Sequence, residues 1–177
     1  MHRRGIVKPK RSRRKRDQRS DTGQPRLSRP NELSKVGQNY EMKTITGGCA
    51  CGAIRYEVTA EPIVTFNCHC RDCQKTTGGG YTPVFYVPAS AFKITKGAPK
   101  YFGTTSEMMG DNVRGFCPEC GSRLFGGKSD FGQGIAAGTL DDPSLYKPQH
   151  EIWTSDAQPW DAMDPKLPKF EKYAPQG

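Results

Sequence analysis

The sequence predicts a mainly β protein with a single folded domain, and length, composition and strand periodicity support this prediction. The 177 residues are enough for one domain with a hydrophobic core. Hydrophobic residues make up only 34% of the chain, whereas it contains 20 glycines and 14 prolines. This composition favours a turn-rich β protein over a helical bundle. Strand-like patterns begin only after residue 42, so we predict a disordered tail over residues 1–41 and one domain over residues 43–173.

The tail, residues 1–41, holds the net positive charge of the chain. It carries 13 Lys and Arg residues and four acidic residues, a net charge of +9 (13 minus 4), whereas residues 42–177 carry 14 of each and are neutral. So polar a segment cannot bury enough apolar surface to offset the entropy of ordering it. It fits a solvated tail, a basic segment for nucleic-acid binding or nuclear import, a transit peptide, or translation upstream of a true start at Met42. Nucleic-acid binding is therefore expected only through the tail.

The sequence pattern shows neither a membrane span nor a secretory signal. No apolar run approaches the roughly 18 residues that a span needs, and the first residues lack the apolar stretch of a signal peptide. We therefore expect a cytoplasmic protein without membrane contact. In a reducing compartment clustered cysteines indicate metal binding or catalysis more than disulfides, and the seven thiols of this chain cannot all pair.

The domain is predicted to consist of short strands. Ile54, Tyr56 and Val58 alternate with polar residues, which indicates a strand with one buried face. After residue 147 the chain contains two tryptophans and several prolines, and we expect an irregular segment draped over the domain. Residues 81–95 are rich in aromatic and branched residues and are expected to form several short strands, interrupted by prolines. Four further segments are strand candidates, the final one being the expected last core strand: 100–105, 113–117, 122–127 and 134–140.

Two cysteine pairs far apart in the chain form the first candidate metal site. Cys49 and Cys51 are two residues apart, so in an extended strand both thiols point to one face. Cys117 and Cys120 form a C-x-x-C pattern followed by Gly121, in which a tight turn aims both thiolates inward and the glycine tolerates a positive φ. Together the pairs provide a closed tetrahedral set of four thiolates, which zinc fits best. We predict a structural zinc at Cys49, Cys51, Cys117 and Cys120, with simple buried thiols as the alternative.

The other three cysteines lie in the stretch CHCRDC. Cys68, Cys70 and Cys73 can surround one ion, and three protein ligands leave a fourth position open, as in catalytic zinc sites. His69 is a candidate fourth ligand, but in an extended segment its side chain points away from the two flanking sulfurs. We expect it to pack or to form a hydrogen bond instead. A different partition of the seven cysteines, or an iron–sulfur cluster, stays open as an alternative.

Glycine and basic residues follow this triplet. Residues 78–80 are three glycines, which either offer backbone N–H groups to an anionic ligand or form a flexible loop between two strands. Arg71 and Lys75 could bind substrate carboxylates or be solvated surface residues. The neutral domain shows no obvious cluster of basic residues for an acidic ligand. It also shows no convincing general base, because His69 and His150 are its only histidines.

Five segments carry a family resemblance: GGCACGAIRYE, CHCRDCQKTTGG, FCPECGSRLF, AAGTLDDP and HEIWTSDAQPW. They resemble the glutathione-dependent formaldehyde-activating (GFA) family, which includes the centromere protein V-like domain, over residues 43–172. The resemblance implies a β-tent fold with two zinc ions. It implies structural zinc ligands at the two cysteine pairs and catalytic ligands at the triplet, as Cys49, Cys51, Cys117 and Cys120, and Cys68, Cys70 and Cys73. It also implies a carbon–sulfur lyase that joins formaldehyde to glutathione as S-hydroxymethylglutathione.

The resemblance and the open triplet together favour an enzyme. We expect a zinc-dependent enzyme of the carbon–sulfur lyase type that acts on thiol–aldehyde adducts, with a small-molecule thiol such as glutathione as its partner. Zinc at the triplet would lower the pKa of the substrate thiol or polarise the aldehyde oxygen, and the sequence leaves both open. The alternative is a non-catalytic, zinc-stabilised binding module whose basic tail contacts nucleic acid. A redox or metal-buffering role of the triplet is a third hypothesis.

Overall fold

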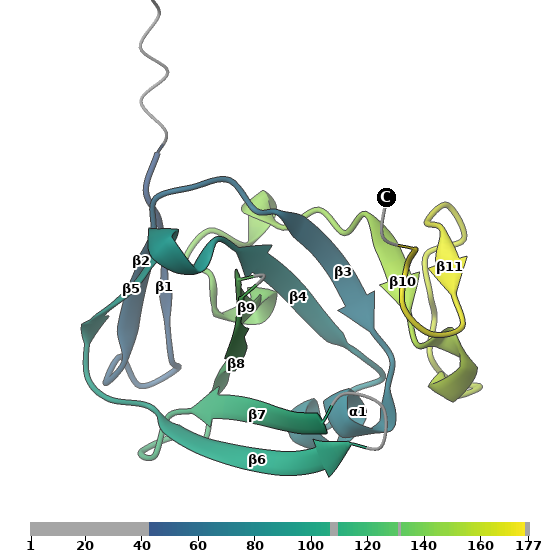
Figure 1. Cartoon of the computed structure of the whole chain (residues 1–177), viewed down its shortest axis with the longest axis horizontal. Helices are drawn as coiled ribbons and strands as arrows, with labels where there is room; N and C mark the ends of the chain where they lie inside the picture. Colours follow the sequence, from purple (N-terminus) through teal and green to yellow (C-terminus); the bar gives the residue numbers. More distant parts are fainter. Residues whose placement is uncertain (1–42, 107–109, 131, 176–177) are drawn as a thin grey trace, which may run out of the picture. The chain divides into compact units, whose positions relative to one another are not determined.

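The computed structural model describes residues 43–106, 110–130 and 132–175, and in these residues strands form two sheets (Figure 1). The smaller sheet has the order β1-β2-β5 and is antiparallel; the larger has the order β11-β10-β3-β4-β9-β8-β7-β6. The strands are β1 (Ile45–Gly48), β2 (Arg55–Val58), β3 (Val64–Cys68), β4 (Thr82–Val87), β5 (Phe92–Lys96), β6 (Lys100–Ser106), β7 (Gly110–Phe116), β8 (Arg123–Ser129), β9 (Gly132–Ala136), β10 (His150–Ile152) and β11 (Lys169–Phe170). The mainly β class is confirmed, whereas the tail lies outside the described residues.

Short helices connect these strands. An α-helix, α1 (Arg71–Thr77), lies between β3 and β4 and was not predicted from the sequence. Four 3-10 helices complete the described part: η1 (Ala89–Ala91), η2 (Ala137–Thr139), η3 (Pro143–Leu145) and η4 (Thr154–Asp156). None of the described helices combines the length and the apolar character that crossing a lipid bilayer requires.

The main hydrophobic core lies between the smaller sheet and strands β4, β8 and β9 of the larger one. The predicted alternation in β2 is confirmed, because Tyr56 and Val58 are 1% and 0% exposed. The Tyr56 ring packs edge-on against Phe125 of β8, with ring centroids 5.5 Å apart. Phe92 of β5 also packs edge-on against the Phe125 ring, with centroids 5.0 Å apart. Such edge-to-face contacts stabilise a core beyond the area that they bury. The aromatic side chains therefore hold the two sheets together.

The prediction of several short strands interrupted by prolines in residues 81–95 is confirmed, because Pro88 and η1 separate β4 in the larger sheet from β5 in the smaller one. One strand prediction needs correction. The segment 134–140 is not the last core strand, because β9 ends at Ala136 and β10 brings the buried Glu151 and Ile152 into the larger sheet. β10 pairs parallel to β3 and β11. Parallel pairing joins segments far apart in the chain, so it leaves no local pattern in the sequence.

Asp141 connects the chain after β9 to the smaller sheet. Nη1 of Arg55 donates to its Oδ1 at 2.9 Å, and the Thr46 hydroxyl donates to its Oδ2 at 2.6 Å. The hydrogen bonds from Arg55 and then from Thr46 hold the pKa of the Asp141 carboxyl below its usual value of 3.8. These groups are largely exposed, so solvent screens the interaction and its stabilising contribution is small.

For Asp141→Asn we expect the free energy of unfolding at pH 7 to fall by at most about 1 kcal/mol. A carboxyl with a lowered folded-state pKa stabilises the fold above its unfolded-state pKa, and this contribution disappears as the pH falls through the lower, folded-state value. The difference between variant and wild type should therefore shrink in acid. Urea unfolding at decreasing pH measures this. A difference that stays constant down to the lowest pH would contradict the role of the ionised carboxylate.

Candidate metal centres and the adjoining cavity

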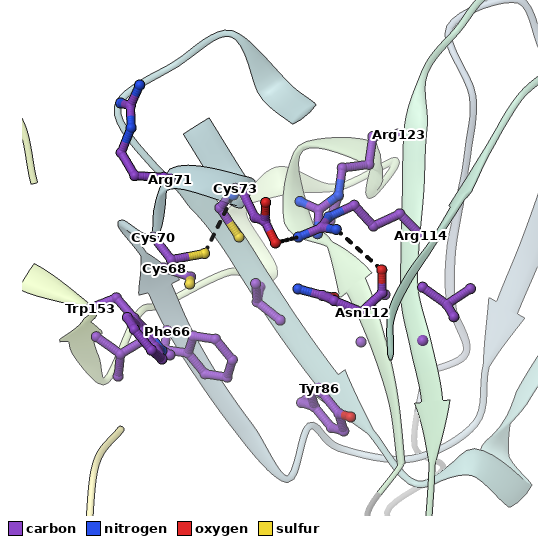
Figure 2. A pocket seen from close by; sticks show the side chains of 18 of the residues that line it. Phe66, Cys68, Cys70, Arg71, Cys73, Tyr86, Asn112, Arg114, Arg123 and Trp153 are labelled. Carbon is purple, nitrogen blue, oxygen red and sulfur yellow. Dashed lines mark hydrogen bonds and ion pairs between the residues drawn. The ribbon is translucent and has the colours of Figure 1, made fainter. Parts of the chain in front are cut away.

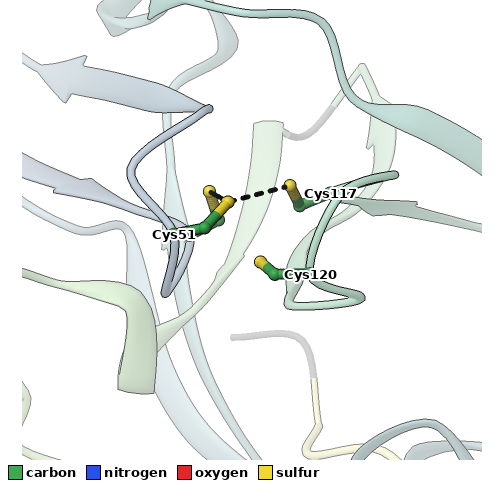
Figure 3. Close-up of side chains that lie close together, drawn as sticks. Cys51, Cys117 and Cys120 are labelled. Carbon is green, nitrogen blue, oxygen red and sulfur yellow. Dashed lines mark hydrogen bonds between the residues drawn. The ribbon is translucent and has the colours of Figure 1, made fainter.

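Four cysteine thiols from two turns come together in the structure. Cys49 and Cys51 follow β1, and Cys117 and Cys120 lie between β7 and β8. Their sulfur atoms all lie within 4.8 Å of one another (Figure 3), with 3.5 Å between Cys49 and Cys51 and 3.8 Å between Cys51 and Cys117. Thiolates about 2.3 Å from a tetrahedral zinc lie about 3.8 Å from one another, so this group could hold such an ion.

Tight turns position these thiols. The N–H of Gly121 donates to the carbonyl oxygen of Cys117 at 2.9 Å, and Gly121 and Gly52 have φ of 73° and 72°, a left-handed conformation that favours glycine. The turn predicted for the C-x-x-C pattern is therefore confirmed. The extended geometry predicted for Cys49 and Cys51 is wrong, because β1 ends before them and a turn brings their sulfurs together.

Hydrogen bonds favour the ionised form of two of these thiols. The N–H of Ile54 donates to Sγ of Cys49 at 3.2 Å. Hydrogen bonds from the hydroxyl and the N–H of Ser122 lower the pKa of Cys120 to about 6. The thiolate is the form that binds metal ions. At Cys49 and Cys120 the polypeptide thus favours the protonation state that a cation requires. The backbone hydrogen bond from Ala53 lowers the pKa of Cys51, but interactions with Cys120 and Cys49 outweigh it and raise this pKa to about 12.

The remaining three cysteines gather around a second point. Cys68 ends β3, Cys70 is the N-cap of α1, and Cys73 lies in the first turn of that helix. Their sulfurs all lie within 4.8 Å of one another, and Sγ of Cys70 accepts a hydrogen bond from the N–H of Cys73 at 3.4 Å. Cys68 and Cys73 are buried, whereas Cys70 is half-buried. Figure 2 shows the three sulfurs on one side of a cavity, so the triplet is open on the side that faces it.

Mutual interactions shift the pKa values of two of these thiols in opposite directions. Hydrogen bonds from Cys68 and Cys70, together with the positive charge of Arg123, hold the pKa of Cys73 well below its usual value. Interactions with its neighbours Cys70 and Cys73, followed by burial, raise the pKa of Cys68. Three thiolates crowded in a buried site repel one another unless a cation compensates them. The donor set therefore suits a metal ion.

His69 lies between two of these cysteines in sequence, but its side chain turns away from them. The fully buried ring has Nε2 at 2.8 Å from Oε2 of Glu151 and Nδ1 at 2.5 Å from Oδ2 of Asp161. Each ring nitrogen thus has a carboxylate oxygen within hydrogen-bond distance, and the two carboxylates hold the ring from opposite ends. The expectation that His69 forms a hydrogen bond is confirmed. Its two partners lie 82 and 92 positions further along the chain, where no local spacing points to them.

A cavity of about 960 Å³ lies beside the three-cysteine group (Figure 2). Its volume suits a small organic molecule. Phe66, Tyr86 and Trp153 line it with aromatic surface. Trp153 has φ of 58°, a left-handed conformation that is rare for a bulky residue, and the Tyr173 ring packs against it with centroids 5.2 Å apart. The chain after β10 therefore holds this tryptophan in a strained conformation at the wall of the cavity.

Basic side chains outnumber acidic ones around the cavity, which corrects the expectation that the domain lacks a basic cluster. Folding gathers these cations from α1, β7, β8 and the segment after β11, although the domain as a whole is neutral. Arginines within predicted strands were the available signal, since a charged residue in a strand needs either solvent or a buried polar partner. Among the described residues, the basic ones are Arg71, Lys75, Arg114, Arg123 and Lys172, and the acidic ones are Asp72 and Asp156.

The three glycines at residues 78–80 connect α1 to β4. Gly78 has φ of 72° and caps the helix, with its N–H donating to the carbonyl oxygen of Gln74 at 2.8 Å. At Gly80 a Cβ would lie 2.8 Å from Cγ of Asp161, so the backbone approaches that residue closely. None of the three is among the described residues that line the cavity. The structure thus favours a connecting role for these glycines over anion binding in the cavity.

Similarity to known proteins identifies the family. The family model described as glutathione-dependent formaldehyde-activating enzyme matches residues 44–156. The chain belongs to the GFA family. All seven cysteines lie within the matched residues, as do Arg114 and Arg123 of the cavity. Lys172 and Tyr173, which also line the cavity, lie beyond the part of the chain that the GFA family model matches.

Two individual proteins illustrate the similarity of this GFA chain to others. A Halomonas elongata protein, provisionally named as a glutathione-dependent formaldehyde-activating enzyme, is 31% identical over 85 residues, or 46% of this chain and 54% of that protein. The match thus spans about half the length of that relative. A crystal structure of a Rhodobacter sphaeroides protein has a TM-score of 0.46 and 19% identity, and the match covers 58% of this chain and 96% of that one.

Proposed function

We propose that this GFA domain is a zinc-dependent enzyme of the carbon–sulfur lyase type, which joins a thiol to an aldehyde at the three-cysteine group. The observation that carries the proposal is the contrast between the two groups: one gathers four thiols, enough for a complete tetrahedral ligand set, whereas the other gathers only three, which open onto a cavity. Family membership and the name of the Halomonas relative support glutathione and formaldehyde as the two reactants, and the family's β-tent fold for this chain.

Two zinc ions per chain fit the two cysteine groups. The sulfur separations of 3.5 and 3.8 Å in the first group match tetrahedral zinc, and all-thiolate donor sets select soft or borderline ions. A zinc at the triplet would supply a Lewis-acidic position for the substrate thiol or the aldehyde oxygen. We assign the ions to Cys49, Cys51, Cys117 and Cys120 as a structural site and to Cys68, Cys70 and Cys73 as a catalytic site.

The reaction needs no oxidant and releases no leaving group. One sulfur–carbon bond forms, the π bond of the aldehyde breaks, and the thiol proton is transferred to the aldehyde oxygen. The positive charge of Arg123 lies close enough to Cys73 to stabilise negative charge on sulfur at this end of the cavity. Phe66 and Trp153 line the same cavity with apolar surface.

The Cys70→Ser variant tests the catalytic role of the triplet. Serine is a good N-cap residue, so α1 and the fold should persist, while the open site loses one of its three thiolates. We expect one zinc ion per chain in place of two, and a fall of at least about 100-fold in the rate of S-hydroxymethylglutathione formation from glutathione and formaldehyde. Elemental analysis and a turnover assay measure the two quantities on the same preparation.

Ser122→Ala, beside the other cysteine group, is the matched control and should keep the rate. Full turnover by Cys70→Ser would reject the triplet as the catalytic site. Two zinc ions in Cys70→Ser with normal near-ultraviolet circular dichroism would reject the ligand assignment.

Two expectations from the sequence stay predictions. Nucleic-acid binding by the basic tail depends on residues 1–41, which lie outside the described residues, and the cytoplasmic location is likewise untested. Binding that weakens steeply with salt and disappears on removal of residues 1–41 would support the first.

A further inference from the structure

We propose that Arg123, together with Arg114, forms the subsite of the cavity that receives an acidic group of the substrate, so that the substrate is a small thiol carrying a carboxylate. The inference rests on the proposed function of the three-cysteine group, which would hold the sulfur end of the same molecule. It names residues that neither the cysteine motifs nor the family resemblance assigned.

Arg123 presents unused hydrogen-bond donors beside the cysteine triplet. It begins β8, lines the cavity, and lies close to Cys73 and Arg114 in Figure 2. Its Nη1 donates to the Thr82 hydroxyl at 2.8 Å, and that hydroxyl donates to the carbonyl oxygen of Cys73 at 3.4 Å. Its Nε is buried and has no hydrogen-bond partner among the described residues. A buried donor without a partner destabilises the protein, and a bound acceptor would remove that cost.

The charge of Arg123 lacks a carboxylate partner. In the described part of the chain no acidic side chain lies within ion-pair distance of it, whereas Arg114 pairs with Asp72, with 3.4 Å between Nη2 and Oδ2. Burial lowers the pKa of Arg123, the neighbouring Arg114 lowers it further, and Cys73 raises it. A partly buried cation beside a second cation is an arrangement that an anionic ligand stabilises.

Arg114 connects the wall of the cavity that carries the two arginines to the helix that carries the thiols. Its side chain is 5% exposed, and Nη1 donates to the Thr104 hydroxyl at 3.0 Å. Its ion-pair partner Asp72 lies on α1, between Cys70 and Cys73. Figure 1 shows α1 beside the ends of β6 and β7, the two strands that carry Thr104 and Arg114. The arginine therefore ties the wall with the guanidinium groups to the helix that carries the thiols.

The chemistry of the two ends defines the ligand. A guanidinium group matches the two oxygens of a carboxylate through parallel N–H bonds. The three-cysteine group faces the same cavity with its open side, and Phe66 and Trp153 line the space nearby with apolar surface. A molecule with a thiol at one end, a carboxylate at the other and a short apolar stretch between them satisfies all three surfaces.

Binding of a matched pair of thiols tests the subsite. The probes are 3-mercaptopropionate and its neutral amide, 3-mercaptopropanamide, titrated calorimetrically into the zinc-loaded full chain. Wild type should bind the acid about 10- to 100-fold more tightly than the amide, the size expected for charged hydrogen bonds. In Arg123→Gln this ratio should fall below about 3-fold. In Arg123→Lys, which keeps the charge but loses the bidentate geometry of the guanidinium group, it should lie between the values of wild type and Arg123→Gln.

Lys75→Gln is the matched control, because it removes one exposed positive charge from the lining of the same cavity. Its ratio should stay within about 2-fold of wild type. No preference for the acid in wild type, or an equal loss in Lys75→Gln and Arg123→Gln, would overturn the proposal. Should Arg123→Gln not fold, a wild-type ratio in Arg123→Lys would overturn it as well.

Turnover of the same thiols with formaldehyde separates this inference from the proposed function. An Arg123-dependent preference in binding, with no turnover of either thiol, supports the subsite and rejects the enzyme. Turnover of both thiols with equal affinities supports the enzyme and rejects the subsite.

Discussion

The Cys117→Ser variant should be unfolded under conditions in which wild type is fully folded. Cys117 is 0% exposed and belongs to the main hydrophobic core together with Cys49. Structural zinc sites contribute an apparent free energy of about 10–16 kcal/mol near neutral pH, which is as large as the whole net stability of a typical domain, about 5–15 kcal/mol. Loss of one thiolate from such a site therefore removes more stability than this domain can spare.

The connection made by the four-cysteine group explains the size of the effect. Cys51 and Cys117 are 66 positions apart, and their sulfurs lie 3.8 Å apart. A metal at this point would link the turn after β1 in the smaller sheet to the turn before β8 in the larger one, and would restrict the unfolded chain by closing a long loop. Without it, the three-stranded sheet is held by the aromatic contacts around Tyr56 and Phe125, the other apolar contacts of the core and the exposed hydrogen bonds to Asp141.

Thermal unfolding followed by circular dichroism measures this prediction, and chelation of zinc in wild type should reproduce it. Cys120→Ser is the control that separates loss of the ion from burial of a hydroxyl group. Because Cys120 is exposed, this variant should lose the same ion without placing a hydroxyl in the core. Cys70→Ser, in the other group, should stay folded. A melting temperature of Cys117→Ser within about 4 °C of wild type, or about 1 kcal/mol, would refute the structural role.

The sequence predicted the features that local chemistry determines. The cysteine groups follow from spacing, since C-x-C and C-x-x-C place thiols within reach of one ion whatever surrounds them. The alternation around Tyr56 shows one buried face directly. The helix α1 escaped prediction because it is only seven residues long and its N-cap is Cys70, a residue type that is not a preferred N-cap.

The features that long-range contacts determine could not be predicted. The charges of residues 42–177 sum to zero, but the fold gathers Arg114 and Arg123 at the cavity and leaves other charges on the surface. The partners of His69 arrive on β10 and on the chain beyond η4. Composition gives only the number of charges, and motif spacing relates only residues that are close in sequence. Neither predicts which distant residues come into contact when β10 pairs in parallel with β3.

Replacing His69 by alanine should lower the free energy of unfolding by about 3–5 kcal/mol, the range for removing one partner of a buried ion pair. The side chains of Glu151 and Asp161 are 1% and 4% exposed, and the substitution leaves both carboxylates buried without this partner. The contact with Glu151 also joins the residue that follows β3 to β10, the strand that pairs with β3. Urea unfolding of the zinc-loaded protein measures the change.

His150→Ala is the matched control, because it removes a histidine from the same region without breaking a buried ion pair. His150 is half-buried, and its ring stacks on Phe66 with centroids 5.8 Å apart. We expect a loss of about 1 kcal/mol. A loss as large as that of His69→Ala would show that packing rather than charge determines the effect.

Neutralising the two carboxylates separates charge from packing in a second way. In the triple variant His69→Ala, Glu151→Gln, Asp161→Asn, no buried charge is left at the cluster, so it should be more stable than His69→Ala alone. Equal stability would assign the whole loss to the space left by the ring. Trp153 follows β10 directly and lines the cavity, so weaker docking of this strand should also free the tryptophan from its left-handed conformation. A histidine that ligates no metal would then determine the shape of the wall that faces the three thiols.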